Sequence, residues 1–93
     1  MQRKSIRNYY LLICKILKEQ SAQHRCDPAV PSFISANQLR DAILIKCSSR
    51  EKNLLWSKIM IEVSKNSNIV ESITIFRGEQ TRVWEWIGAD VSL

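Results

Sequence analysis

The sequence predicts an α+β domain in which three helices are followed by a C-terminal β-hairpin. Apolar residues recur three and four positions apart until about Asn68, as on one face of a helix, and alternate at intervals of two after it. Two segments of the helical part each begin with a serine that has Gln or Glu three residues later, which is typical of a helix N-terminus. The length of 93 residues and the apolar fraction of 45% fit one small globular domain. We therefore expect a single domain over residues 1–93, with residues 1–4 and 88–93 as loose ends.

The first helix is expected from Ser5 to about Gln20. Residues 21–33 contain both prolines and show no periodicity, so a loop is expected there. Phe33 and Ile34 fit either a brief strand or a hydrophobic lead-in to the next helix. The apolar stripe of the first helix consists of Ile6, Tyr9, Tyr10, Ile13, Ile16 and Leu17.

Two further helices begin at capping boxes, Ser35 with Gln38 and Ser48 with Glu51. The third helix has a wide apolar stripe and ends at the polar residues 66–68, where an Asn can adopt the left-handed conformation. The residues expected toward solvent on this helix are Arg50, Asn53 and Ser57, with Lys52 and Lys58 near the edges of the stripe.

The β-hairpin is expected from segments 69–76 and 81–87, which are rich in β-branched and aromatic residues and are separated by Arg77–Gln80. Trp84 and Trp86 lie on one strand face, and closing the core is a better explanation for them than an exposed recognition strip. The expected core consists of Ile13, Ile16, Leu17, Leu39, Ile43, Leu55, Ile59, Val63, Ile73, Ile75 and at least one of Trp84 and Trp86.

The composition favours a polyanionic partner but does not require one, because the net charge is +5. No apolar run approaches the ~18 residues of a membrane span, and the basic, then apolar N-terminus lacks a cleavage site for a signal peptide. We therefore expect a protein of the cytoplasm with no membrane partner.

Catalytic and metal-binding patterns are not found in the sequence. One His, no Gly-rich phosphate loop and no nucleophile with a base at recognisable spacing argue against an enzyme or a cofactor. Cys14, Cys26 and Cys47 could form a zinc site with His24, but their spacing matches no known ligand set, and free thiols are the expected state.

The order of helix, loop, short strand, two capped helices and hairpin resembles that of winged helix-turn-helix domains. Many small proteins of this class from viruses, phages or plasmids bind duplex DNA as dimers. The resemblance implies sequence-selective DNA binding by a transcription or replication regulator, located in the host cytoplasm or nucleoid. It also implies that the third helix enters the major groove with Arg50, Lys52, Asn53, Ser57 and Lys58, and that the hairpin contacts DNA through Arg77, Gln80 and Arg82. Arg3, Lys4 and Arg7 could reach the adjacent phosphates.

Two features favour an alternative, a protein-binding module that acts as an inhibitor or adaptor on a host protein. Glu79 lies beside Arg77 in the hairpin turn, and the exposed face of the helix with Trp56 is only modestly basic. A homodimer through the first helix is also expected, because Leu11, Leu12 and Cys14 add apolar surface around its other side.

Overall fold

The structure is a computed structural model that describes the backbone of residues 2–88 and the side chains from Ile6 onward. Its three strands form one antiparallel sheet in the order β1-β3-β2. The α+β fold of a winged helix is therefore confirmed, with the expected short strand before the second helix. The elements are α1 (Gln2–Cys26), β1 (Phe33–Ser35), α2 (Ala36–Ile43), α3 (Ser49–Ser64), β2 (Ile69–Phe76) and β3 (Glu79–Trp86).

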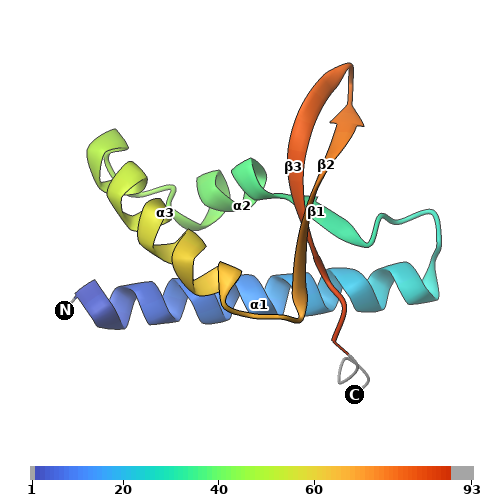
Figure 1. Ribbon diagram of the computed structural model, residues 1–93, viewed down its shortest axis with the longest axis horizontal. Helices are drawn as coiled ribbons and strands as arrows, with labels where there is room; N and C mark the ends of the chain where they lie inside the picture. Colours follow the sequence, from blue (N-terminus) through green and yellow to red (C-terminus); the bar gives the residue numbers. More distant parts are fainter. Residues whose placement is uncertain (1, 89–93) are drawn as a thin grey trace.

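Helix α1 is longer than the sequence predicts and runs along the base of the molecule (Figure 1). Its last turns are stabilised by bonds to the connection before β1. Gln20 Nε2 donates to the carbonyl of Pro31 at 2.5 Å, and His24 Nδ1 lies 2.6 Å from the carbonyl of Val30. The expected loop at residues 21–33 is therefore wrong for residues 21–26. The expected loose end at residues 1–4 is wrong for residues 2–4, which are helical, and residues 89–93 lie outside the described part.

Both predicted N-caps are present, but only the one at Ser48 is a complete capping box; at Ser35 the return bond to the Gln38 side chain is not formed. Ser35 Oγ accepts from the backbone N–H of Gln38 at 3.3 Å. Ser48 Oγ accepts from the N–H of Glu51 at 3.2 Å, and the Glu51 carboxylate accepts in return from the N–H of Ser48 at 3.3 Å. These bonds satisfy N–H groups that a helix start leaves without partners.

The hairpin turn has two residues instead of the predicted four. Arg77 and Gly78 have φ values of 55° and 81°, so both adopt the left-handed conformation. Two-residue turns with two positive φ values match the right-handed twist of the paired strands. Pairing consequently begins at once with Phe76 and Glu79, and β3 starts two residues earlier than predicted.

The core lies where α1 and α3 pack on the inner half of the sheet. Trp84 of β3 stacks on Trp56 of α3 with ring centroids 5.4 Å apart, and Lys18 of α1 lies over the ring of Trp86. Of the predicted core, Ile16, Ile43 and Leu55 are half-buried and packed against it. The buried members of the predicted core are Ile13, Leu17, Leu39, Ile59, Val63, Trp84 and Trp86.

Two predicted core residues are exposed. Ile73 and Ile75 have 58% and 65% of their surface accessible. The outer half of the hairpin projects beyond the helices (Figure 1), so no helix covers these side chains. Leu44, which the prediction did not include, is completely buried in the turn after α2.

Candidate functional site

The outward face of α3 carries four of the five predicted DNA-contacting residues of this helix. Arg50, Asn53, Ser57 and Lys58 are all exposed. Lys52 is half-buried. Its ammonium nitrogen lies 3.6 Å from Oδ1 of Asp41, a residue of α2. Lys52 was expected to share one accessible surface with Arg50, Asn53 and Lys58. It is less exposed than these three residues and is paired with Asp41.

The middle of that face consists of apolar side chains and a serine whose hydroxyl is hydrogen-bonded to the helix backbone. Leu54 and Ile61 are 53% and 55% exposed, and their spacing from Arg50 and Ser57 places all four on one side of the helix. The hydroxyl of Ser57 donates to the backbone carbonyl of Asn53 at 3.0 Å. The face thus presents two large apolar side chains between its polar groups.

Asp41 lies close to two cationic side chains, one from α2 and one from α3. Its Oδ1 accepts from Arg40 Nε at 3.0 Å and also pairs with Lys52. The hydrogen bond from Arg40, assisted by the charges of Arg40 and Lys52, holds the pKa of Asp41 below its usual value. The carboxylate therefore offsets one of the two positive charges, and the cluster keeps one net positive charge.

The predicted wing residues are exposed, but their charges are partly compensated. The guanidinium of Arg77 lies over the ring of Phe76. Arg82 Nε is 3.4 Å from Glu71 Oε2, while Glu71 Oε1 accepts from the indole N–H of Trp84 at 2.9 Å. Gln80 is exposed on the strand that begins with Glu79.

Helix α1 presents one of the predicted phosphate-contacting residues and two apolar residues within the described side chains. Arg7 is exposed, whereas the side chains of Arg3 and Lys4 lie outside the described part. Leu11 and Leu12 are 47% and 41% exposed. Cys14 is buried beside Asn66, so it belongs to the core and cannot line a dimer interface as predicted.

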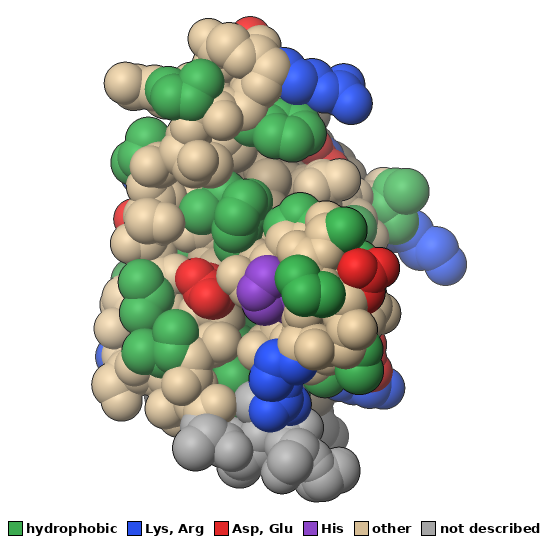
Figure 2. All heavy atoms as spheres, turned by 90° about the vertical axis from the view of Figure 1, so that its right-hand side faces the viewer, with side chains coloured by type: hydrophobic (Ala, Val, Ile, Leu, Met, Phe, Trp, Pro, Cys, Tyr) green, Lys and Arg blue, Asp and Glu red, His purple; other side chains and the backbone are tan. Residues whose placement is uncertain are grey.

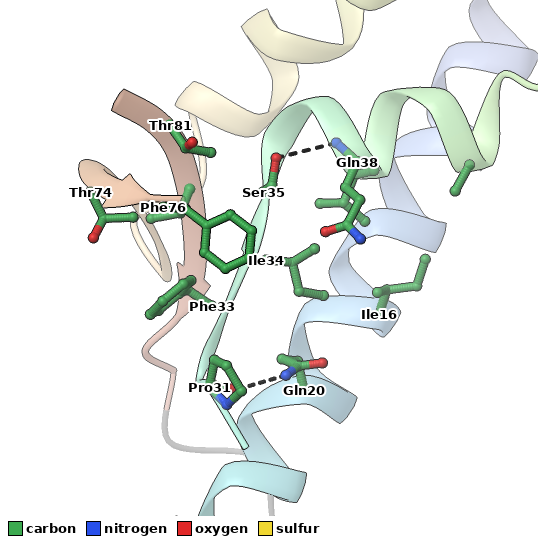
Figure 3. A pocket seen from close by; sticks show the side chains of 13 residues that line it. Ile16, Gln20, Pro31, Phe33, Ile34, Ser35, Gln38, Thr74, Phe76 and Thr81 are labelled. Atoms are coloured by element: carbon green, nitrogen blue, oxygen red, sulfur yellow. Dashed lines mark hydrogen bonds between the residues drawn. The ribbon is translucent and has the colours of Figure 1, made fainter. Parts of the chain in front are cut away.

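A groove that the sequence did not reveal lies between the hairpin and the helices, with a volume of about 450 Å³. Phe33, Phe76 and Thr81 lie on its strand side, and Ile16 and Gln38 approach from α1 and α2 (Figure 3). In the sequence, the large apolar Phe76 next to the hairpin turn was the one sign of this groove. The other walls come from segments far apart in the sequence, so no local pattern indicates them. The remaining lining residues are Gln20, Pro31, Ile34, Ser35, Leu39, Ala42, Thr74 and Val83.

Cysteine and histidine side chains do not converge. In residues 6–88, no three His, Cys, Asp or Glu side chains lie where they could hold a metal ion. Cys26 is exposed, Cys47 is half-buried, and all three thiols are free. No helix among the described residues has the length and apolarity to span a membrane.

Comparison with known proteins places the chain in a family. The family model described as the Man1-Src1p-C-terminal domain matches residues 1–89. The chain belongs to this family. It is 35% identical over 95 aligned residues to the inner nuclear membrane protein SRC1 of Saccharomyces cerevisiae. The alignment covers 89% of this chain but only 11% of the yeast protein. No solved structure matches the chain significantly.

The family membership corrects the predicted function. The relative is an inner nuclear membrane protein, so the prediction of a DNA-binding regulator from a virus, phage or plasmid is wrong. The cytoplasmic or nucleoid location and the exclusion of a membrane are wrong for the same reason. Element order identified the fold correctly, but many unrelated functions use the same fold.

Proposed function

We propose that this chain is a domain of an inner nuclear membrane protein and that it docks a protein partner at that membrane. The match of residues 1–89 to the Man1-Src1p-C-terminal domain and the similarity to yeast SRC1 support the location. The proposal includes no chemical reaction. Because the chain spans about a tenth of the yeast protein, membrane attachment is a property of the whole protein.

The observation that carries the docking role is the composition of the outward face of α3. Leu54 and Ile61 are both more than half exposed in its middle. Exposed apolar residues surrounded by polar ones are characteristic of protein contacts. A helix that reads DNA needs donors and cations at these positions instead.

The distribution of charge supports the same role. Lys52 and Arg40 share Asp41, and Arg82 pairs with Glu71. Salt-dependent affinity for nucleic acid depends on how many cations can neutralise phosphates. Arg40, Lys52 and Arg82 are therefore less available to phosphates than unpaired cations would be.

The three free thiols support a position on the nucleoplasmic side of the membrane. Cys26 is exposed on the last turn of α1. Exposed thiols persist in reducing compartments, whereas the oxidising lumen favours disulfides. We therefore propose that the docked partner is a nuclear protein.

Site-specific cross-linking in cells tests the docking role. A photo-reactive phenylalanine analogue is placed at Leu54 or Ile61 of the full-length protein, and at exposed Gln23 as the control. We expect cross-linked adducts from the two α3 positions and few from Gln23. Protease should degrade the cross-linked partner, and nuclease should leave it intact. Adducts that nuclease removes, or equal yields at all three positions, would reject the docking role of α3.

Extraction of isolated nuclei tests the location. The endogenous full-length protein should stay with the nuclear membrane fraction after washing with high salt and alkaline carbonate. A protein that is released by high salt alone would contradict residence in the membrane.

A further inference from the structure

The groove between the hairpin and the helices lies beside a strand edge that is only partly paired. Strand β3 pairs with β2 along all eight residues, from Glu79 to Trp86, whereas β1 pairs only with Val83, Trp84 and Glu85. The chain turns into α2 directly after β1. The outer part of β3 therefore has one free edge within the described structure.

The backbone groups at this edge can be assigned from the register. In a hairpin with a two-residue turn, the two residues that flank the turn, here Phe76 and Glu79, exchange both backbone hydrogen bonds. Along the strands, such hydrogen-bonded pairs alternate with pairs whose N–H and C=O groups point away from each other. The N–H and C=O groups of Gln80 and Arg82 consequently point away from β2, toward the free edge. No backbone hydrogen bond outside the regular elements of residues 2–88 involves either residue.

The groove and the free edge belong to the same stretch of β3. Thr81, whose side chain lines the groove, lies between Gln80 and Arg82. A residue of an added strand that pairs with Thr81 would point its side chain to the same sheet face and hence into the groove. The volume of about 450 Å³ is within the range of small-ligand pockets and accommodates one large side chain with room to adjust.

The charge next to the groove indicates the neighbouring residue of the partner. Glu79 shares the sheet face of Thr81, since the two positions are two residues apart on one strand. Its carboxylate forms no ion pair with any described residue. A cation directly across the strands from Glu79 would therefore be favourable.

We propose that the groove binds an extended segment of a partner protein, which continues the sheet beyond β1 along the free edge of β3. The segment pairs with Gln80 and Arg82, places a large apolar side chain in the groove opposite Thr81, and carries Lys or Arg opposite Glu79. Its sequence pattern in the direction of β1 is a large apolar residue, any residue, then Lys or Arg. This inference rests on the proposed docking of a protein and locates one contact of it.

Titration of the purified chain with a defined peptide tests the proposal. The probe is the acetylated peptide Thr-Phe-Thr-Lys-Ser, in which Phe pairs with Thr81 and Lys pairs with Glu79, so that its first Thr lies opposite Arg82, next to the end of β1 at Ser35. We expect saturable shifts of the backbone amide signals of Gln80 and Arg82 in nuclear magnetic resonance spectra. The amide signals of Ile73 and Ile75 should not move, because they face the other edge of the hairpin. Absence of shifts at Gln80 and Arg82 at millimolar peptide, or shifts confined to Ile73 and Ile75, would overturn the proposal.

Two peptides that differ in one methyl position test strand addition itself. Methylation of the backbone nitrogen of the second Thr, which pairs with Gln80, removes an interstrand bond and should weaken binding about tenfold or more. Methylation of the Phe nitrogen, which points away from β3, should change binding by about twofold or less. Equal losses for the two peptides would exclude the proposed register.

Substitutions in the chain test the groove and the charge. Phe76→Ala should weaken peptide binding. The control Ile75→Ala, at a similarly exposed residue on the other sheet face, should not. Glu79→Lys should weaken binding of the Lys peptide and strengthen binding of the peptide with Glu in its place. If Phe76→Ala and Ile75→Ala behave alike, the groove is not the site. That result leaves the docking role open to the separate cross-linking test at α3.

Discussion

Trp84 contacts α3 with its ring and the neighbouring strand β2 with its indole N–H. Its ring stacks on Trp56 at a centroid distance of 5.4 Å, and its indole N–H donates to Glu71 at 2.9 Å. The side chain is 1% exposed. A large aromatic side chain contributes strongly to stability when its apolar surface is buried and its N–H group is hydrogen-bonded.

Trp84→Ala should therefore lower the free energy of unfolding by about 3–5 kcal/mol. Ile75→Ala, at a position that is 65% exposed, should change it by about 0.5 kcal/mol or less. Urea unfolding followed by far-ultraviolet circular dichroism measures both. A large loss for Ile75→Ala would mean that the outer hairpin is covered in solution.

Asp41 makes stability depend on pH. Its pKa in the folded protein is held below the usual 3.8, mainly by the hydrogen bond from Arg40. The folded state therefore binds this proton less readily than the unfolded state does. The resulting stabilisation is complete above the usual pKa and is lost as the pH falls through the lowered pKa of the folded state.

Asp41→Asn should consequently destabilise the protein near neutral pH and have little effect in strong acid. Denaturant unfolding of both proteins at the two pH values measures the difference. Because the carboxylate is exposed, the effect is small. A difference between the two proteins that stays the same in acid would contradict this role of the charge.

The start of α3 and the end of α1 are stabilised by different kinds of interaction. Helix α3 begins at a complete capping box formed within four residues, Ser48 to Glu51. The C-terminal turns of α1 instead depend on Gln20 and His24 contacting the segment before β1. Local sequence therefore determines the first boundary, and tertiary contacts determine the second.

Ser48→Ala should cost about 1 kcal/mol of stability, because it removes the acceptor for the N–H of Glu51. Ser49→Ala, at the exposed first residue of α3, should cost about 0.5 kcal/mol or less. Thermal and urea unfolding of the pair gives the comparison. Equal costs would show that the capping bond contributes nothing in solution.

On the scale of the whole molecule, hydrophobic side chains remain on several surfaces. Seen from the end of α1 that carries His24, they extend over the surface up to the outer hairpin (Figure 2). On α1, Leu11 and Leu12 are each more than two-fifths exposed. The homodimer through α1 stays a prediction that rests on these two leucines.

Light scattering at tens of micromolar tests this dimer. The mass should correspond to two chains, and the double variant Leu11→Gln, Leu12→Gln should become monomeric because it loses the shared apolar surface. The matched variant Ile73→Gln on the hairpin should stay dimeric. A monomeric parent chain would remove the prediction.

The sequence by itself determined the features that depend on neighbouring residues. The helix caps at Ser35 and Ser48, the strand from Ile69 to Phe76 and the burial of Trp84 and Trp86 were predicted correctly. Periodicity, cap spacing and β-branched composition act within a few residues, so they can be recognised without the fold. Of the candidate site, the exposure of the residues on α3 and the wing was predictable in the same way, except for Lys52.

Only the tertiary structure decided which surfaces are covered and which residues meet. An alternating strand predicts an apolar face, but the reach of the helices left Ile73 and Ile75 in solvent. The pairing of Lys52 with Asp41 and the groove beside Phe76 also join segments that are separate in the sequence. Such contacts arise from the packing of whole elements against one another, and no local pattern specifies that packing.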